Sequence, residues 1–462
     1  MTTSPTVTLN TTSVGEQLDR MPVGTVHRKA IVVVGLGLFF EMYEIFLAST
    51  MSTALRRDFG IRGTELDVVL ASAFVGMFFG AALFGRLADR IGRRKTFLLG
   101  LTWFSVFSLL GALAPSPALL VGSRFLAGVG VGAEYPVADS YLADVLPKER
   151  RGRLASYAYT CSFLAVPFAG FLAMWLTKHS PLGIAGWRWL LTIGGLGFVI
   201  VFLLNRWLPE SPRWLAGVGR IDDAQRELDK FAAGAKVRAL PIENGPGAPG
   251  GAGVGPEQGS AALTRLRHAP YNRRLSMLGV FHLFQTFGYY GFGTLAALVL
   301  VSRGYDVTSS MFFAALSFLG YPIGSAVSIP LMARFERKFL LVGATVAIAA
   351  FGLMFATQSS VPSIVVFGFL TTATANVFSN VYHVYQAEIF PTAVRATAVG
   401  WTYSLSRLSS GASPFILIPV LDRYGAGAMF TVVAMALAVV IVAVLALGPR
   451  TSRRSLEDIN PA

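Results

Sequence analysis

Apolar and polar positions alternate along the chain in long blocks rather than with the short periods of a soluble protein. Apolar runs of about twenty residues, the length that an α-helix needs to cross about 30 Å of hydrocarbon, follow one another with polar breaks between them. The pattern predicts an all-α membrane protein with twelve transmembrane helices, at residues 29–50, 67–88, 96–114, 117–140, 154–177, 187–208, 274–300, 309–332, 339–357, 361–386, 396–420 and 426–448.

A hydrophilic stretch in the middle of the chain divides these spans into two groups of six. Within it, RIDDAQRELDKFAAG has the pattern of a short amphipathic helix, and PIENGPGAPGGAGVGPEQGS is rich in glycine and proline, as flexible linkers are. We therefore expect an N-terminal tail, a six-helix bundle, a linker, a second six-helix bundle and a C-terminal tail, at residues 1–28, 29–208, 209–272, 273–448 and 449–462.

The second half of the chain repeats features of the first. A shift of 244 residues, without a gap, brings the same residue types together at the ends of predicted helices. Two halves related by duplication are typical of transporters in which one half rocks against the other around a central site, so we expect two pseudo-symmetric bundles. The matched pairs are Arg90 with Arg334, Arg93 with Arg337, Asp144 with Glu388, Pro147 with Pro391, and Arg151 with Arg395.

Composition agrees with a membrane protein. Of the 462 residues, 53% are hydrophobic and 14% are charged, against roughly 25% charged in an ordinary soluble protein. The net charge of +14 comes with clusters of Lys and Arg between apolar runs, which indicates cytoplasmic loops rather than a nucleic-acid surface. Their distribution predicts a multi-pass protein of the cell (inner) membrane with both termini in the cytoplasm. The first 26 residues lack a signal-peptide core, and the single Cys161 excludes an internal disulfide.

Four short motifs resemble the major facilitator superfamily. GRLADRIGRRK at 85–95 resembles its signature loop between helices two and three, and RFLAGVGVGAEYP at 124–136 resembles its fourth-helix motif. PESPRWL at 209–215 is similar to the end of the first half in sugar porters and their organic-ion relatives. DVLPKERRG and EIFPTAVRA match the acid, proline and arginine pattern at the cytoplasmic ends. The chain is therefore identified as a member of this superfamily, which implies two six-helix bundles and transport by alternating access.

Two further resemblances concern the substrate. Residues 41–44, Glu-Met-Tyr-Glu, resemble the D-G-[YF]-D motif of aromatic-acid and other metabolite:proton symporters, although both acids are glutamate and Met42 replaces a glycine. Residues 133–136, Ala-Glu-Tyr-Pro, resemble the G-[DE]-x-P of that group and of phosphate:proton symporters. The sugar-porter pattern P-x-Y-x-x-E reads D-S-Y-L-A-D at 139–144, which is evidence against a sugar.

The first predicted helix carries two acids where lipid would make them costly. Glu41 and Glu44 are three positions apart, on one helix face, and the second half has Gln285 and Gly288 in their places. An acid in an apolar cavity favours its neutral form, so either glutamate is a candidate proton carrier. Glu134 lies near the middle of the fourth helix. The resemblance gives Arg124 a role in proton coupling through a buried acid, whereas an interfacial arginine reaching for water is the alternative. The predicted proton-coupling residues are Glu41, Glu44, Arg124 and Glu134.

Arg407 is predicted to lie in the middle of the bilayer, twelve residues after Arg395. An isolated cation there is costly, so it should meet Glu41, Glu44, Glu134 or the substrate's own carboxylate. An apolar pocket with a few polar groups suits a small, aromatic acid. His282 and His383 are also candidates for a proton relay, with a hydrogen-bonded packing role as the alternative for each. The predicted substrate-binding residues are Tyr43, Gln285, Tyr289, Asn376, Asn380, Tyr382, His383, Tyr403 and Arg407.

A cytoplasmic gate is predicted from the motif loops. Asp89 can pair with Arg93 or with the positive end of a neighbouring helix, while Arg90, Arg93 and Arg151 are expected to face Asp144, Glu149 and Glu210. Because these pairs form together only when the cytoplasmic side is closed, they can shift the equilibrium between the inward-open and outward-open states by a few kcal/mol. Ala333 replaces Asp89 in the second half, which indicates a one-sided latch. The predicted gate residues are Gly85, Asp89, Arg90, Gly92, Arg93, Asp144, Arg151, Glu210, Glu388 and Arg395.

Together these features predict a secondary active transporter that imports a small organic anion with protons. We expect no enzymatic activity, no metal and no cofactor beyond the proton gradient, because phosphate loops, metal-ligand spacings and nucleophile elbows are absent from the sequence. The expected partners are the anion, protons and the lipid bilayer, without nucleic acid, and a single chain suffices for function. One alternative is a facilitator or proton antiporter of a sugar or of a cationic, drug-like solute. Another is a nutrient receptor, for which the sequence offers no long signalling domain.

Overall fold

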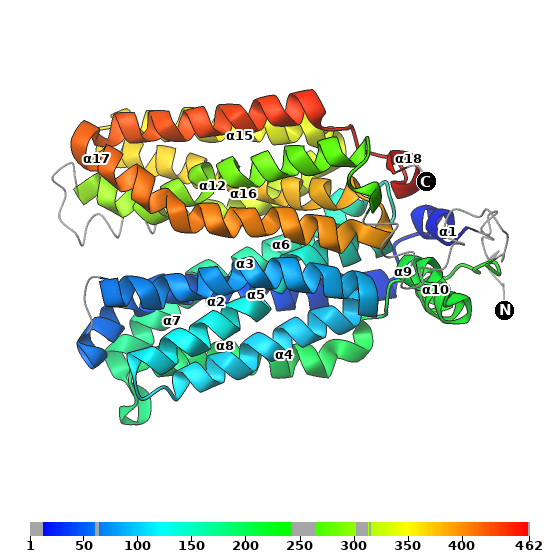
Figure 1. The fold of residues 1–462 in the computed structure, drawn as a ribbon, viewed down its shortest axis with the longest axis horizontal. Coiled ribbons are helices and arrows are strands. Elements are labelled where there is room, and N and C mark those ends of the chain that lie inside the picture. The colour runs from blue at the N-terminus through cyan, green and yellow to red at the C-terminus, as the bar shows by residue number, and fades with distance from the viewer. Residues whose placement is uncertain (1–12, 61–63, 243–263, 302–312, 314–315, 461–462) are drawn as a thin grey trace.

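The computed structural model describes residues 13–60, 64–242, 264–301, 313 and 316–460. Regular structure within those residues is helical and contains no β-strand, so the prediction of an all-α protein is confirmed. Figure 1 shows two bundles that lie side by side with their long axes parallel. The first contains α2 (Thr25–Phe59), α3 (Thr64–Ile91), α4 (Arg93–Ala112), α5 (Pro117–Val145), α6 (Arg151–Phe163), α7 (Ala165–His179) and α8 (Gly186–Leu204). The second contains α12 (Tyr271–Val301), α14 (Gly320–Arg334), α15 (Arg337–Thr357), α16 (Val361–Glu388) and α17 (Arg395–Leu447).

The helices follow the predicted spans with local differences. The span predicted at 154–177 is divided between α6 and α7 at Leu164. The label α17 covers both spans predicted at 396–420 and 426–448, as two helices that meet at the non-helical Gly425, where φ is +79°. Most of the glycine-rich linker predicted at 241–260, and the start of the span predicted at 309–332, lie outside the described residues. The count of twelve spans remains a prediction.

Several of these helices have the length and composition of membrane spans. Among the described residues, eight stretches qualify, the most apolar being part of α17. The stretch that forms α5 does not qualify, and it carries Arg124, Glu134, Asp139 and Asp144 along its length. Large apolar side chains are exposed on the outer faces of both bundles, as at Leu83, which is 60% exposed. A surface of this kind is suited to lipid rather than to water.

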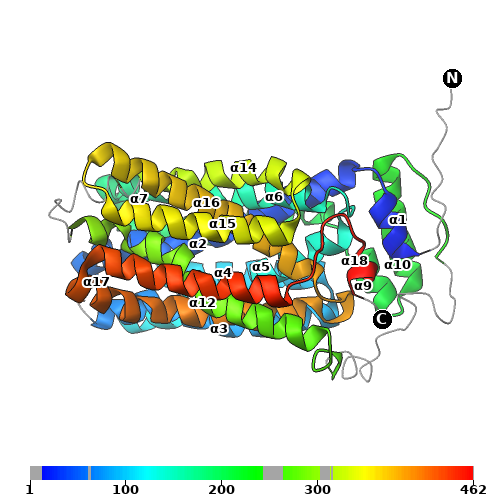
Figure 2. The same ribbon diagram turned by 90° about the horizontal axis from the view of Figure 1, so that it is seen from above.

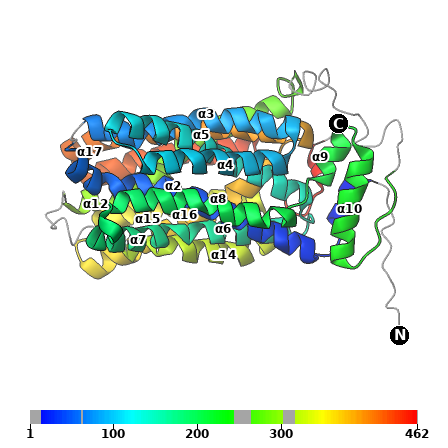
Figure 3. The same ribbon diagram turned by 90° about the horizontal axis from the view of Figure 1, so that it is seen from below.

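Both described ends of the chain lie at one end of the molecule. Figures 2 and 3 show α1 (Val14–Arg20), α9 (Pro212–Gly217) and α10 (Ile221–Ala235) beyond one end of the two bundles, with α18 (Leu456–Ile459) beside them. We call this the tail end, and the opposite one the far end. The predicted amphipathic helix in the linker corresponds to α10, which buries Ala224, Leu228, Phe231 and Ala232.

Glycines in α5 allow three helices of the first bundle to pack closely. A Cβ atom at Gly128 would overlap the carbonyl oxygen of Ala73 in α3, and one at Gly132 would overlap that of Met77. Gly130 lies against the backbone of α4 in the same way. Side chains would separate these helices, so the glycines serve packing.

The change Gly128→Ala is expected to destabilise the folded protein by about 1–3 kcal/mol, because the added methyl group must displace the α3 backbone. The matched control is Gly122→Ala on the same helix, where a Cβ would meet nothing within 4 Å. Equilibrium unfolding of the purified protein in detergent measures both variants. Equal stabilities would contradict the close approach of α3 and α5.

Candidate substrate and proton site

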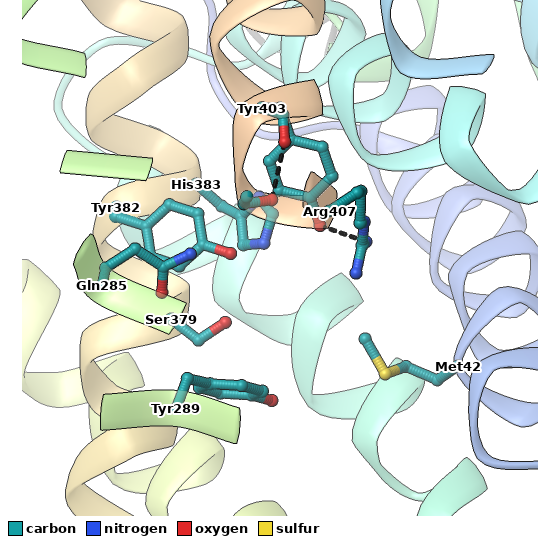
Figure 4. A pocket seen from close by; sticks show the side chains of 9 residues that line it. Met42, Gln285, Tyr289, Ser379, Tyr382, His383, Tyr403 and Arg407 are labelled. Carbon is teal, nitrogen blue, oxygen red and sulfur yellow. Dashed lines mark hydrogen bonds between the residues drawn. The ribbon is translucent and has the colours of Figure 1, made fainter. Parts of the chain in front are cut away.

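A small cavity lies between the two bundles, near the middle of their length. Its volume is about 10 Å³, room for about one water molecule, so the cavity must widen before it can hold a substrate. Figure 4 shows that its side chains come mainly from three helices of the second bundle, α12, α16 and α17, with Met42 of α2 opposite them. The lining residues are Met42, Gln285, Tyr289, Ser379, Tyr382, His383, Tyr403, Ser406 and Arg407.

Arg407 provides the positive charge of this cavity. It is buried, its Nη2 atom donates a hydrogen bond to the hydroxyl of Tyr403 at 2.7 Å, and its guanidinium lies 4.8 Å from the centroid of the Tyr403 ring. Gln285 is also buried, and its Oε1 atom has no hydrogen-bond partner among the described residues. The guanidinium of Arg407 and the amide of Gln285, placed among aromatic rings, can hold a planar anion.

Two buried carboxyl groups of the first bundle lack hydrogen-bond partners among the described residues. Both oxygens of Glu41 in α2, and both of Glu134 in α5, are buried without a partner in the part of the chain that the structure describes. Glu41 interacts electrostatically with Arg407 and Asp139, and Glu134 interacts with Glu41. A buried acid without hydrogen bonds favours its neutral form, so both groups can hold a proton.

Glu44 lies in a different environment from Glu41, although the two were expected on one helix face. Its Oε2 atom is 2.5 Å from Nη1 of Arg124, and Ser108 of α4 donates a hydrogen bond to Oε1. Arg124 also donates to the backbone oxygen of Glu44 at 3.2 Å. Both charged side chains are buried, so Arg124 is a buried partner of Glu44 rather than an interfacial arginine.

Asp139, which is not among the predicted site residues, connects the two bundles beside the cavity. Its Oδ2 atom lies 2.7 Å from Nδ1 of His383 and accepts a hydrogen bond from Nε2 of Gln386, also at 2.7 Å. Its Oδ1 atom accepts from the hydroxyl of Tyr159 at 2.7 Å. The signal available in the sequence was an acid in place of the proline of the sugar-porter pattern.

Three predicted substrate residues do not line the cavity. Tyr43 donates from its hydroxyl to the backbone oxygen of Leu190 in α8, within the first bundle. The amide of Asn376 donates to the backbone oxygen of Tyr321, and that of Asn380 donates to Ser325, both in α14. These polar groups satisfy contacts between helices, which sequence spacing alone cannot distinguish from a site.

Two ion pairs cross between the bundles at the tail end. Arg395 of the second bundle pairs with Asp144 of the first, and Arg151 of the first pairs with Glu388 of the second, at 3.4 Å. The two pairs are exchanged by the internal repeat, which matches Asp144 with Glu388 and Arg151 with Arg395. Arg151 was expected to face Asp144. Instead it contacts Glu388 and, at 3.1 Å, Asp19 of α1. We call these residues, with Arg93 and Asp89, the tail-end cluster.

Arg93 and Asp89 add further contacts between the bundles. Arg93 lies 3.1 Å from Asp144 and 3.0 Å from Asp89, and it donates to the backbone oxygen of Thr392 at 2.6 Å. Asp89 accepts from the backbone N–H of Thr397 at 2.7 Å, at the start of α17. An acid at the N-terminus of a helix is favourable, so both pairings expected for Asp89 are present.

The remaining predicted gate residues have distinct places. A Cβ at Gly85 would overlap the carbonyl oxygen of Ala396 in the second bundle, and Gly92, with φ +104°, lies against Glu210. Glu210 accepts from the backbone N–H groups of residues 93, 94 and 211 at 3.0–3.1 Å. Burial raises the pKa of Glu210, and these hydrogen bonds oppose the increase. Arg90 is exposed and lies outside the cluster, contrary to expectation.

Comparison with known proteins gives consistent findings. A family model described as "Sugar (and other) transporter" matches residues 29–462. YyaJ of Bacillus subtilis, whose provisional name is that of a metabolite transport protein, is 32% identical over 394 residues, which cover 85% of this chain and 86% of YyaJ. The niacin transporter NiaP of Acinetobacter baylyi is 29% identical over 450 residues, which cover 96% of this chain and 98% of NiaP.

A solved transporter has the same fold. The proton:xylose symporter XylE, of the major facilitator superfamily, bound to 6-bromo-6-deoxy-D-glucose, gives a TM-score of 0.76 at 19% identity. The similarity covers 94% of this chain and 98% of XylE. The inward open conformation of XylE from E. coli gives a lower TM-score, 0.63, over the same 94% of this chain and 99% of XylE.

Proposed function

Because the chain belongs to the sugar (and other) transporter family of the major facilitator superfamily, we propose that it imports a small organic anion together with protons. It is a multi-pass membrane protein whose relatives are transporters. The observation that carries the proposal is buried Arg407 in the lining of the cavity, which interacts electrostatically with the buried carboxyl group of Glu41, and Glu41 in turn interacts with Glu134. The arginine attracts an anion, and the two acids can hold protons.

The substrate that fits best is a small aromatic carboxylate. Tyrosine and histidine rings line the cavity together with Arg407, and flat rings pack well against an aromatic substrate while a guanidinium holds its carboxylate. The similarity to NiaP, a niacin transporter, supports the same class and makes nicotinate, the anion of niacin, the first compound to test.

The transport cycle that we propose uses the tail-end cluster as its cytoplasmic gate. In this arrangement the tail end faces the cytoplasm, with both termini, and the membrane is the cell (inner) membrane. Loops rich in Lys and Arg at that end support this orientation. Substrate and protons enter from the far end while the cluster is closed. Separation of its ion pairs then opens the cavity to the cytoplasm, in a single chain driven by the proton gradient.

The proposal is tested with purified protein in liposomes that contain a trapped pH dye and a radiolabelled substrate. The panel contains nicotinate, benzoate, aliphatic carboxylates, phosphate, sugars and cationic drugs. We expect an aromatic carboxylate to enter together with internal acidification beyond that of protein-free vesicles, which measure passive entry of the undissociated acid. Arg407→Ala is expected to lower uptake at least 100-fold, since the anion loses its cation at a buried site, and Glu41→Gln to lower the acidification per molecule of substrate that enters.

Arg423→Ala is the matched control, because Arg423 is exposed near the far end of α17. It is expected to leave uptake and acidification unchanged. Substrate flux without a pH change would identify a facilitator and remove the role of Glu41 as a proton carrier. Uptake of sugars or cations alone, unaffected by Arg407→Ala, would refute an anionic substrate.

A further inference from the structure

Asp139 and His383 form a contact between the bundles that the proposed function does not use. Asp139 lies on α5 of the first bundle and His383 on α16 of the second, and both are buried. Oδ2 of Asp139 and Nδ1 of His383 are 2.7 Å apart. Unlike the tail-end cluster, this pair is next to the cavity, because the ring of His383 lines it.

We propose that His383, held by Asp139, binds one of the protons that accompany each substrate anion. The inference rests on the proposed function and assigns a proton site to residues on both bundles. The proton comes from the side where the substrate enters and binds to Nε2 of His383. It leaves the same nitrogen toward the other side of the membrane. Asp139 keeps its negative charge throughout.

Hydrogen bonding fixes which nitrogen of His383 is available. Asp139 receives hydrogen bonds from the Gln386 amide and the Tyr159 hydroxyl, as an ionised carboxylate does. An ionised carboxylate accepts and cannot donate, so the hydrogen in its contact with His383 belongs to Nδ1. In the neutral ring Nε2 is then an acceptor. A substrate carboxylate is also an acceptor, and it can bond to Nε2 only after that nitrogen has gained a proton.

The surroundings of His383 link the proton to the anion. The ring stacks on Tyr135, with centroids 4.1 Å apart, and makes a tilted contact with the ring of Tyr382, with centroids 4.2 Å apart. Arg407 is the other cation of the cavity and opposes a second positive charge there until an anion binds. The titratable or charged groups around the ring are Tyr135 and Asp139 of α5, Tyr159 of α6, His282 of α12 through Gln386, Tyr382 of α16, Tyr403 and Arg407 of α17, and Glu41 of α2 through Asp139 and Arg407.

Opening of the tail end provides a route for release. Asp139 and His383 belong to different bundles, so they separate when the bundles do. Without its carboxylate partner a protonated histidine next to Arg407 loses its main stabilising interaction. His383 therefore binds the proton more tightly in the closed state and releases it when the substrate leaves.

The test measures proton uptake when benzoate binds to purified protein in detergent. Calorimetry in two buffers with different ionisation enthalpies gives the number of protons taken up per benzoate. We expect His383→Asn to lower that number by about one, and to lower the slope of log Kd against pH by about one, a tenfold change in Kd per pH unit. Asp139→Asn, which keeps the size of the side chain, is expected to have the same effect and serves if His383→Asn does not fold.

His179→Asn is the matched control, because His179 is an exposed histidine at the far end of α7. It should leave proton uptake unchanged. If both His383→Asn and Asp139→Asn take up as many protons per benzoate as the wild-type protein, the inference is wrong while the proposed function stands. The same holds if the variants lose affinity by the same factor at every pH. If the wild-type protein neither binds nor transports benzoate or nicotinate, the proposed function fails, and the inference fails with it.

Discussion

Replacing Gly400 with valine is expected to hold the two bundles apart at the tail end and to reduce transport at least tenfold. A Cβ at Gly400 of α17 would overlap the carbonyl oxygen of Ala81 and would lie 3.2 Å from Cα of Gly85, both in α3 of the other bundle. Because the overlap is between bundles, separation relieves it while each bundle stays folded. Valine therefore shifts the conformational equilibrium rather than the folding equilibrium.

Spin-label distances across the tail end measure this effect. Arg90→Cys and Arg334→Cys, on a Cys161→Ser background, place labels at exposed positions on opposite bundles. The mean distance should increase in Gly400→Val. Gly343→Val is the control, because a Cβ there would meet nothing within 4 Å. An unchanged distance together with normal transport would show that α3 and α17 do not need to approach each other closely.

Removing the guanidinium in Arg124→Ala is expected to destabilise the protein by about 3–5 kcal/mol and to abolish proton-coupled uptake. The change leaves the carboxylate of Glu44 buried, with Ser108 as its remaining side-chain hydrogen-bond donor. An uncompensated buried charge costs more than the ion pair contributed. Equilibrium unfolding in detergent and the liposome assay measure the two effects.

A second substitution separates stability from transport. In the double variant Glu44→Gln and Arg124→Ala, no charge is left buried at this position, so most of the lost stability should return while proton coupling does not. If the single change alters neither stability nor uptake, the Glu44–Arg124 pair has no structural or functional role. If the double variant transports normally, the pair serves stability alone.

The helices were predictable because membrane spans are long and apolar. The two bundles were predictable because a single shift of the second half onto the first, without gaps, aligns the repeated residues. Arg407 was identified for a similar local reason: a cation far from either end of a predicted span has few structural explanations. It lines the cavity with five other predicted residues, Gln285, Tyr289, Tyr382, His383 and Tyr403. The sequence is informative where a single residue conflicts with its surroundings.

The pairings were not predictable, because they depend on the packing of distant segments. Glu41 and Glu44 are three positions apart, yet α4 and α5 provide partners to Glu44 and none to the carboxyl oxygens of Glu41 among the described residues. Arg151 contacts Glu388, 237 positions away, rather than the nearer Asp144. Asp139 gained its significance only when the fold placed His383 beside it.

The composition of the tail-end cluster also makes the proposed gate sensitive to temperature. Its contacts between bundles are buried ion pairs, such as Asp144 with Arg395, rather than apolar surfaces alone. Opening exposes these ions to water, and the hydration of ions becomes less favourable on warming because its entropy is strongly negative. Warming therefore favours the closed form of the proposed gate, so the fraction of molecules with a closed tail end should increase with temperature.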